Sequence, residues 1–172
     1  MNGEELPHTL DADLCPELAP LAWLVGRWEG AGVYGYPTIT SGHFGQEIVV
    51  SHDGRPFLEM HSHSWLLDDQ GKATRRSATE LGVWRKLPDG EVELLLTHPT
   101  GILEMYVGRL EAGRNSIQLR TDSVVRSTAA KEYNAGSRMY GLFDADLMWV
   151  MDMAAMGHEM LPHLSARLKR VG

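Results

Sequence analysis

Hydrophobic and polar residues alternate over short segments through most of this chain, a pattern typical of β-strands with one buried face. Val92, Leu94 and Leu96 occupy every second position of residues 91–96, with glutamates before and between them. Residues 117–122 alternate in the same way. Because successive side chains of a strand point to opposite faces, each such segment predicts a strand that packs one face on a core.

Segments of this kind follow one another along the chain, separated by short stretches rich in glycine, aspartate and asparagine. The predicted strands are 27–34, 44–52, 57–67, 75–86, 91–98, 101–111, 116–125, 131–143, 147–155 and 162–171. Links such as Asp53-Gly54, Asp69-Gln70-Gly71 and Asp89-Gly90 supply residues that tolerate the positive φ of tight turns. Short links make neighbouring strands antiparallel, and closing the sheet removes the exposed edges that invite aggregation. The sequence therefore predicts an all-β fold, a single antiparallel up-and-down β-barrel of about ten strands.

A chain of 172 residues has the length of one domain and can bury a substantial core. Residues 1–20 are expected to form an N-terminal lead-in, and residues 21–172 are expected to form the barrel. Residues 18–25 are apolar but interrupted by Pro20, so we expect at most a turn or two of helix there.

Charge and composition exclude several classes of protein. The net charge of −7 argues against a nucleic-acid partner, because phosphates call for a basic surface. No apolar run approaches the roughly 18 residues that a membrane helix needs, so no membrane partner is expected. The acidic N-terminus, with Glu4 and Glu5, lacks the features of a secretory signal, and the single cysteine, Cys15, fits a reducing cytoplasm. A cytoplasmic protein with small-molecule partners is expected, whereas nothing in the sequence marks an interface that would set the oligomeric state.

The densest local motif lies at the start of the first predicted strand, where Gly26, Trp28, Gly30 and Gly32 are spaced GxWxGxG. No strand precedes this motif and no helix follows it, so it is not a dinucleotide-binding loop. A structural role is favoured: Trp28 can plug the closed end of a barrel, while Gly30 and Gly32 let the strand coil sharply. Similar openings occur in lipocalins and fatty-acid-binding proteins, so the motif indicates a calycin-like barrel without specifying a ligand.

Most of the histidines suggest no site of their own. His61 and His63 lie two apart on one predicted strand and face the same way, but no third metal ligand is evident, so surface or cross-strand packing is favoured. His98 precedes a proline at a turn, where bonding to the backbone is favoured over catalysis. His43 and His52 lie near strand ends with no visible partner.

His163 has a different context, because Pro162 fixes the backbone before it and the last predicted strand begins there, at a rim of the barrel. A histidine held on a rigid element beside an apolar cavity suits the proximal side of a haem iron. Spacing alone nevertheless favours a histidine satisfied by ordinary hydrogen bonds.

Methionines cluster in the last third of the chain, at positions 139, 148, 151, 153 and 156. Methionine suits an adaptable apolar cavity. Simple filling of the core is the favoured interpretation.

Several separated motifs, in this order and spacing, resemble the nitrobindin family from about Leu21 to the C-terminus. The motifs are Gly26–Gly32, Tyr36–Ile39, Gly82–Arg85, Gly90–Leu94, His98–Gly101 and Pro162–Leu164, the last followed by a basic strand with Lys169 and Arg170.

This resemblance implies a ten-stranded barrel similar to fatty-acid-binding proteins, with haem b near one open end. It implies that His163 is the axial ligand of the haem iron, that Thr38 lies against the haem and that Lys131 pairs with a propionate. The chain departs from the family at Ala78, where many relatives carry a histidine two residues before the glutamate that matches Glu80. A distal histidine is therefore missing, whereas ligation by His163 does not depend on it.

The family is associated with ferric haem that binds nitric oxide and converts peroxynitrite to nitrate, so the resemblance implies a haem-dependent peroxynitrite isomerase with His163 as its catalytic residue. A barrel that carries a fatty acid or another apolar ligand remains an alternative. Arg120 and Arg138 could meet a ligand carboxylate, but both sit among polar neighbours and are expected to be solvated. A haem carrier or nitric-oxide sensor without turnover would need the same proximal ligand and open site.

Overall fold

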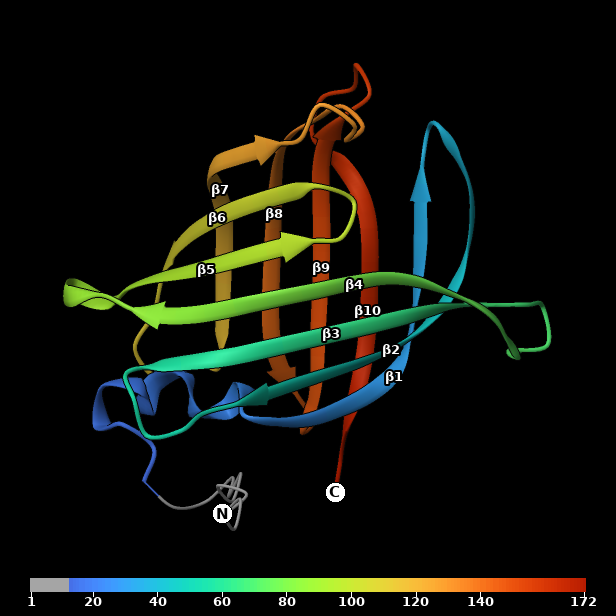
Figure 1. The fold of residues 1–172 in the computed structure, drawn as a ribbon. Helices are drawn as coiled ribbons and strands as arrows, with labels where there is room; N and C mark the ends of the chain where they lie inside the picture. The colour runs from blue at the N-terminus through green and yellow to red at the C-terminus, as the bar shows by residue number, and fades with distance from the viewer. Residues whose placement is uncertain (1–12) are drawn as a thin grey trace, which may run out of the picture.

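Ten strands, each paired with antiparallel neighbours, close into a barrel in the computed structural model, which describes residues 13–172 (Figure 1). The strands are β1 Gly26–Tyr36, β2 Ile39–Ser51, β3 Phe57–Leu67, β4 Ala73–Lys86, β5 Glu91–His98, β6 Ile102–Arg109, β7 Ser116–Arg126, β8 Tyr133–Phe143, β9 Asp146–Ala155 and β10 Leu161–Val171. Consecutive strands pair along the whole sequence, and β1 pairs with β10 to complete the ring, for example at Trp28 opposite Arg170. The predicted antiparallel up-and-down barrel is confirmed.

The predicted strand limits hold best where one face is buried and the other is solvated. β3 and β5 have the predicted limits. β2 begins at Ile39, five residues before the predicted start. The prediction missed these first residues because they are exposed on both faces and show no hydrophobic alternation. β1 and β2 are consequently joined by a tight turn at Pro37 and Thr38.

Tight turns with positive φ join the strands, as the glycine and aspartate pairs predicted. Asp89 and Gly90 have φ of 61° and 76° between β4 and β5. Asp144 and Ala145 have φ of 49° and 65° between β8 and β9. Two successive residues in this region give the backbone twist that matches a pair of antiparallel strands, so each turn fixes the register of its hairpin.

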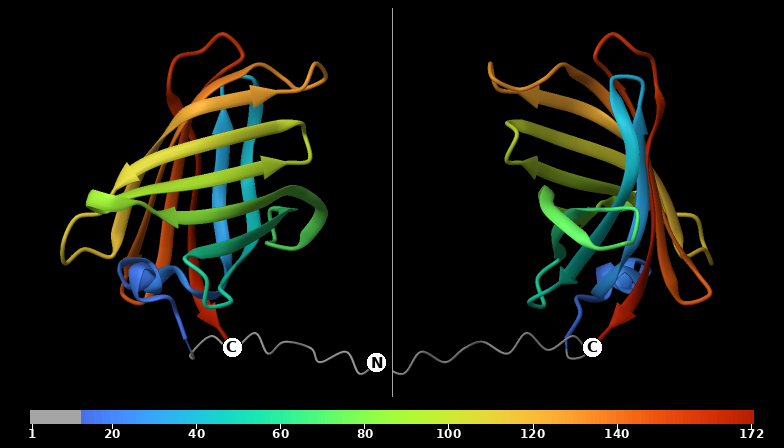
Figure 2. Two further views of the ribbon diagram at one scale, coloured as in Figure 1. Left: turned by 60° about the vertical axis from the view of Figure 1, so that its left-hand side comes forward. Right: turned by 90° about the vertical axis from the view of Figure 1, so that its right-hand side faces the viewer.

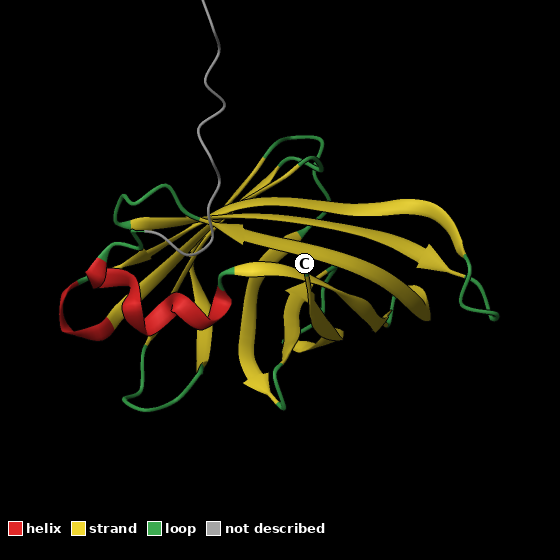
Figure 3. Cartoon of the chain, turned by 90° about the horizontal axis from the view of Figure 1, so that it is seen from below, coloured by secondary structure: helices red, strands yellow, loops and turns green. Residues whose placement is uncertain are grey.

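A 3-10 helix, η1 Pro16–Leu24, covers one end of the barrel (Figure 3). Its own residues Leu18, Leu21 and Leu24 are buried against the barrel, and the indole Nε1 of Trp28 donates to the Leu24 carbonyl at 2.9 Å. The guanidinium of Arg170, on β10, lies 4.2 Å from the centroid of the Trp28 ring. Trp28 therefore plugs this closed end, as predicted.

The lead-in and the barrel meet within this helix. η1 spans the expected boundary between residues 20 and 21, and residues 1–12 of the lead-in lie outside the described part of the chain. Figure 2 shows the β1–β2 and β9–β10 turns together at the end of the barrel away from the helix. The barrel therefore has one covered end and one end formed by turns. In residues 13–172 no helix is long and apolar enough to span a membrane.

The interior of the covered half is filled by inward-facing apolar side chains. Val92, Leu94 and Leu96 are buried on β5, as their alternation predicts. The methionine prediction is wrong for Met139 and Met148, which are 48% and 40% exposed on the outer faces of β8 and β9. Strand alternation explains the difference, because each lies one residue from an inward-facing neighbour. Met156 is also exposed, whereas Met151 and Met153 pack in or against the core.

Replacing Gly30 with alanine is expected to destabilise the barrel by roughly 1–3 kcal/mol, the usual cost of overpacking. A methyl group there would lie 2.9 Å from the Cα of Leu168 and closer still to the carbonyl oxygen of Arg167, both backbone atoms of the paired strand. Urea unfolding of wild type and Gly30→Ala measures the difference. Gly141→Ala is the matched control, because a methyl group there meets only ordinary contacts of 3.5 Å and 3.8 Å. Equal losses in both variants would contradict the close-approach explanation.

Candidate functional site

His163 lies at an irregularity in β10, at the end of the barrel formed by turns. Pro162 pairs with Asp152 and Leu164 pairs with Met151, so His163 is the extra residue of a β-bulge. A bulge re-aims the side chain of the residue that it inserts. The imidazole is half-buried and lines a cavity that opens at this end. The predicted location of His163 at the rim is therefore what the structure shows.

A hydrogen bond to the first strand fixes the His163 ring. Nδ1 lies 3.0 Å from the carbonyl oxygen of Gly35. A carbonyl only accepts hydrogen bonds, so Nδ1 carries the proton and Nε2 of the neutral ring keeps its lone pair. Burial lowers the pKa of His163, and the charge of Arg138 lowers it further, although the bond to Gly35 acts in the opposite direction. The neutral, metal-binding form of the imidazole is therefore favoured.

Tyr36 supports the same ring from the side. Its ring meets that of His163 edge-on, with 5.7 Å between the centroids, and meets His158 in the same way. The Tyr36 hydroxyl accepts a hydrogen bond from the Ala155 amide at 3.1 Å and lies within reach of two carbonyl oxygens on β9. Tyr36 thus joins three strands around the histidine.

The cavity beside His163 has a volume of about 580 Å³ and largely apolar walls. Its aromatic and aliphatic lining consists of Tyr34, Ile39, Phe44, Leu66, Trp149 and Leu164. The polar residues Thr40, Ser62, Ser64 and Ser77 also line it. Volumes of roughly 300–1,000 Å³ with apolar walls and a few polar groups are typical of ligand sites.

Two cations, Arg75 and Lys131, line the cavity from exposed positions on β4 and on the link between β7 and β8. Ala78 lines the cavity as well, where the family pattern would place a histidine. Thr38 is exposed in the turn between β1 and β2, and the residues of this hairpin that line the cavity include Ile39 and Thr40 but not Thr38. The structure thus brings His163 and Lys131 to one cavity.

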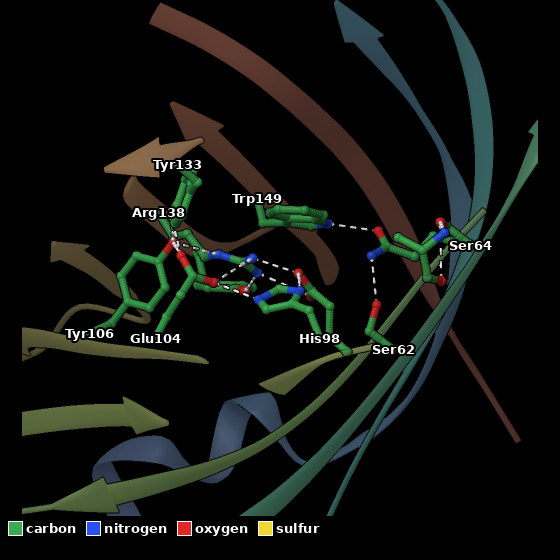
Figure 4. A network of polar contacts seen from close by, with 12 residues as sticks. Ser62, Ser64, His98, Glu104, Tyr106, Tyr133, Arg138 and Trp149 are labelled. Atoms are coloured by element: carbon green, nitrogen blue, oxygen red, sulfur yellow. Dashed lines mark hydrogen bonds and ion pairs between the residues drawn. The ribbon is translucent and has the colours of Figure 1, made fainter. Parts of the chain in front are cut away.

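A network of buried polar side chains lies across the barrel interior (Figure 4). Arg138 on β8 is 1% exposed and donates to both carboxylate oxygens of Glu80 on β4, at 2.5 Å and 3.1 Å. The Glu104 carboxylate accepts hydrogen bonds from the hydroxyls of Tyr106 and Tyr133 and contacts His98 Nε2 at 2.6 Å. This network replaces an apolar core over the middle of the barrel.

A second chain of hydrogen bonds joins the network to the cavity wall. Trp149 Nε1 donates to Gln46 Oε1 at 2.8 Å, and Gln46 Nε2 donates to Ser62 Oγ at 2.9 Å. Trp149 also lies beneath the guanidinium of Arg138, 5.4 Å from ring centroid to Cζ. All three members of the chain line the cavity, so the floor of the cavity is polar and internally satisfied.

The surroundings of Glu80 and Glu104 favour the ionised form of both carboxyl groups. Burial by itself raises the pKa of Glu104, but the hydrogen bond from His98, the charge of Arg138 and the two tyrosine hydroxyls outweigh it and lower the pKa to about 2. Burial likewise opposes ionisation of Glu80, and the adjacent Arg138 holds its pKa below the usual range. Two buried carboxylates therefore surround one buried guanidinium.

Two expectations about interior residues are wrong. Arg138 is not solvated but buried, whereas Arg120 is exposed as expected. His98 bonds to the Glu104 carboxylate rather than to the backbone. The alternation along β8 could have predicted that Arg138 is buried. Arg138 lies two residues from the buried Tyr140, on the same face of the strand, whereas the exposed Met139 lies on the opposite face.

The other histidines lie away from the cavity or on its outer side. His61 is exposed, and His63 contacts Thr79 across the β3–β4 pair at 3.4 Å. His52 is buried near the end of β2. His43 lines an exposed groove on the outer face of β1, β2 and β10.

The fold and the site together define a class of protein, a calycin-like barrel with a neutral histidine beside an open apolar cavity. Residues 17–170 match the family described as the THAP4-like, heme-binding beta-barrel domain. The chain is 48% identical over 165 residues to a peroxynitrite isomerase of Nocardioides sp., covering 96% of this chain and 99% of the relative. It is 45% identical over 162 residues to a ferric nitrobindin-like protein of Streptomyces griseus subsp. griseus, covering 94% and 85%.

A solved structure has the same fold. The crystal structure of Rv2717c from M. tuberculosis superposes with a TM-score of 0.84 at 34% sequence identity, covering 93% of this chain and all of that chain. The chain belongs to this family of haem-binding barrels, the nitrobindin family.

The residues around the cavity fit a haem. Metal-binding histidines usually donate their second ring nitrogen to a carbonyl or carboxylate, as His163 does to Gly35. The apolar walls suit the porphyrin faces, and Arg75 and Lys131 offer positive charge for its acidic groups. The donor set and the cavity therefore agree with the cofactor of the family.

Replacing Glu104 with glutamine is expected to lower the stability of the haem-free protein at pH 7 by about 3 kcal/mol, the value of a fall in pKa from 4.5 to about 2. A carboxyl whose pKa is lowered by folding stabilises the protein above its unfolded pKa, and this contribution is lost as the pH falls through the folded pKa. The difference between wild type and Glu104→Gln should therefore shrink as the pH falls from about 4.5 to about 2.

Urea unfolding at a series of pH values measures this difference. Glu111→Gln serves as the control, because Glu111 forms only an exposed ion pair with Arg114 and should leave the pH profile unchanged. A difference between wild type and Glu104→Gln that does not vary with pH would show that ionisation of Glu104 contributes nothing.

Proposed function

We propose that this protein binds haem b through Nε2 of His163 and isomerises peroxynitrite to nitrate at a ferric iron with an open coordination position. The observation that carries the proposal is the hydrogen bond from His163 Nδ1 to the Gly35 carbonyl beside the cavity, in a chain of a haem-binding family. Relatives with up to 48% identity bear the name peroxynitrite isomerase, which supports the same activity here.

His163 contributes a fixed, neutral ligand. The bond to Gly35 selects the tautomer, and the edge of Tyr36 limits rotation of the ring, so Nε2 keeps one direction. Because burial lowers the pKa of His163, a proton competes weakly for the ligating nitrogen. The β-bulge at Pro162 and Leu164 places this ligand on a strand rather than on a loop.

The cavity contributes access and dryness. A ferric haem held by His163 would supply a Lewis-acidic iron for the isomerisation of peroxynitrite and for binding nitric oxide. Phe44, Leu66 and Leu164 give the cavity apolar walls, which offer water no hydrogen bonds. With alanine at position 78, polar contacts to a small anion fall to hydroxyl groups such as that of Thr40.

Positive charge at the mouth orients the cofactor. We assign Lys131 and Arg75 to the haem propionates, because both side chains line the cavity from exposed positions. Thr38, in the adjoining turn, is assigned a contact with the haem edge. The same cations attract anionic peroxynitrite to a protein whose net charge is −7. Activity in the cytoplasm accords with the single cysteine, Cys15.

A fatty-acid carrier is disfavoured by the state of the interior arginine. Such a carrier uses a buried arginine to bind the ligand carboxylate, but the Arg138 donors are taken by Glu80 and by two tyrosine hydroxyls. A haem carrier or nitric-oxide sensor would use the same cavity and the same ligand, so turnover decides between these functions.

His163→Ala is expected to weaken haemin binding by at least about tenfold, because the iron loses its only protein ligand in the proposal. Titration with haemin should give the wild type a Soret band that saturates at one haem per chain. The control is His158→Ala, since His158 contacts the same Tyr36 ring but does not line the cavity. Unchanged binding by His163→Ala would refute the assignment.

Peroxynitrite decay, followed by stopped flow with the same proteins, tests turnover. Haem-loaded wild type should accelerate the formation of nitrate in proportion to its concentration, and His163→Ala should not. A normal Soret titration without acceleration would leave a haem-binding protein and reject the isomerase function.

Lys131→Gln and Arg75→Gln should each weaken haemin binding by about two- to fivefold, the usual worth of an exposed ion pair. Added salt should reduce the difference from wild type, because exposed charges are screened. Lys169→Gln is the control, since Lys169 is exposed far along β10 and pairs opposite Glu29. If all three variants bind haemin as tightly as wild type, the propionate assignment is wrong.

A further inference from the structure

Arg138 has the surroundings of a carboxylate-binding arginine inside a barrel. Its side chain is 1% exposed, and its guanidinium lies between the rings of Tyr106 and Trp149, at 5.3 Å and 5.4 Å from the centroids. The hydroxyls of Tyr140 and Tyr106 lie 3.1 Å and 3.3 Å from its nitrogens. An arginine with tyrosine hydroxyls in a water-poor interior is a strong site for a planar anion.

Glu80 occupies that site. Both of its carboxylate oxygens accept hydrogen bonds from the terminal nitrogens of Arg138, in the fork geometry that a ligand carboxylate would adopt. Glu80 lines the cavity, whereas Arg138 is not among the lining residues. The Glu80 side chain therefore stands between the guanidinium and any molecule that enters from the open end.

Charge prevents a second carboxylate from joining the first. Arg138 Nη2 lies 3.9 Å from Glu104 Oε2 in addition to its bonds with Glu80, so two carboxylates already share the guanidinium. His98 lies within 3.8 Å of Glu80 and 2.6 Å of Glu104. A ligand carboxylate at this depth would lose its water and meet two like charges.

We propose that Glu80 acts as a built-in carboxylate ligand of Arg138 and thereby excludes fatty acids and other carboxylates from the barrel interior. Glu80 is in this sense a specificity-determining residue of a barrel whose shape would otherwise suit an apolar acid. The exclusion does not depend on haem. For a protein that binds haem as proposed above, it also keeps the propionates out of the interior and directs them to Arg75 and Lys131 at the mouth.

Removing the Glu80 carboxylate should open the site to a carboxylate added in solution. Thermal melts of haem-free Glu80→Ala are run with increasing sodium propionate, and with matched sodium chloride and propanol. The melting temperature of Glu80→Ala should rise with propionate alone, because a ligand that binds only the folded state stabilises it. Wild type should show no such rise.

A fluorescent fatty acid, dansylundecanoate, tests the longer ligand in Glu80→Ala, which removes both the charge and the side chain that occupies the Arg138 site. This variant should bind the probe at least about tenfold more tightly than wild type, since a buried carboxylate–guanidinium contact becomes available. The double variant Glu80→Ala with Arg138→Met removes the anion site and should respond to neither ligand.

Poor folding of Glu80→Ala does not prevent the test. An unpaired guanidinium in the interior is costly, so refolding is measured alongside melting. Its refolding yield is then compared in propionate and in chloride, and a yield that depends on propionate supports the proposal.

Three results would overturn the proposal. They are equal stabilisation of wild type and Glu80→Ala by propionate, an equal response of the double variant, and no effect of propionate on either the melting or the refolding of Glu80→Ala. None of these measurements uses haem, so failure of the proposed haem function would leave them unaffected.

Discussion

Closure of ten strands leaves an interior wider than apolar side chains fill, and the rest of this structure follows from how that space is used. At the covered end, Trp28 and the buried leucines of η1 fill it. At the open end the space remains as a cavity of about 580 Å³. Between them lies a layer of buried charges centred on Arg138. The barrel interior thus has three layers, and the layer at the open end is the one that offers space to a ligand.

The middle layer shows why the cavity has a floor. Breaking a buried ion pair by removing one partner is strongly destabilising, whereas the intact pair adds little net stability over an apolar pair. Arg138 and Glu80 therefore contribute mainly by fixing how the interior is arranged, because their ion pair joins β8 to β4 across the barrel. Trp149 and Gln46 extend this layer to the cavity wall, so the same residues both support the site and limit its depth.

The sequence predicts the strands and their closure because alternation and turn residues act locally. The position of His163 at the rim was also predictable, from the motif that precedes it and the resemblance to a family. The pairing of Arg138 with Glu80 was not, because these residues are 58 positions apart and meet only once the barrel is closed. The early start of β2 escaped prediction for another reason, since residues exposed on both faces show no alternation.

The hydrogen bond between His163 and Gly35 joins residues 128 positions apart, one on the last strand and the other on the first. These two strands are the pair that completes the ring. A chain that has been synthesised only as far as β9 has Gly35 and most of the cavity wall, but it lacks both His163 and the β1–β10 pairing that orients the His163 ring. Where His163 holds the haem as proposed, capture of haem therefore waits until β10 has paired with β1, and chains without that pairing do not compete for the cofactor.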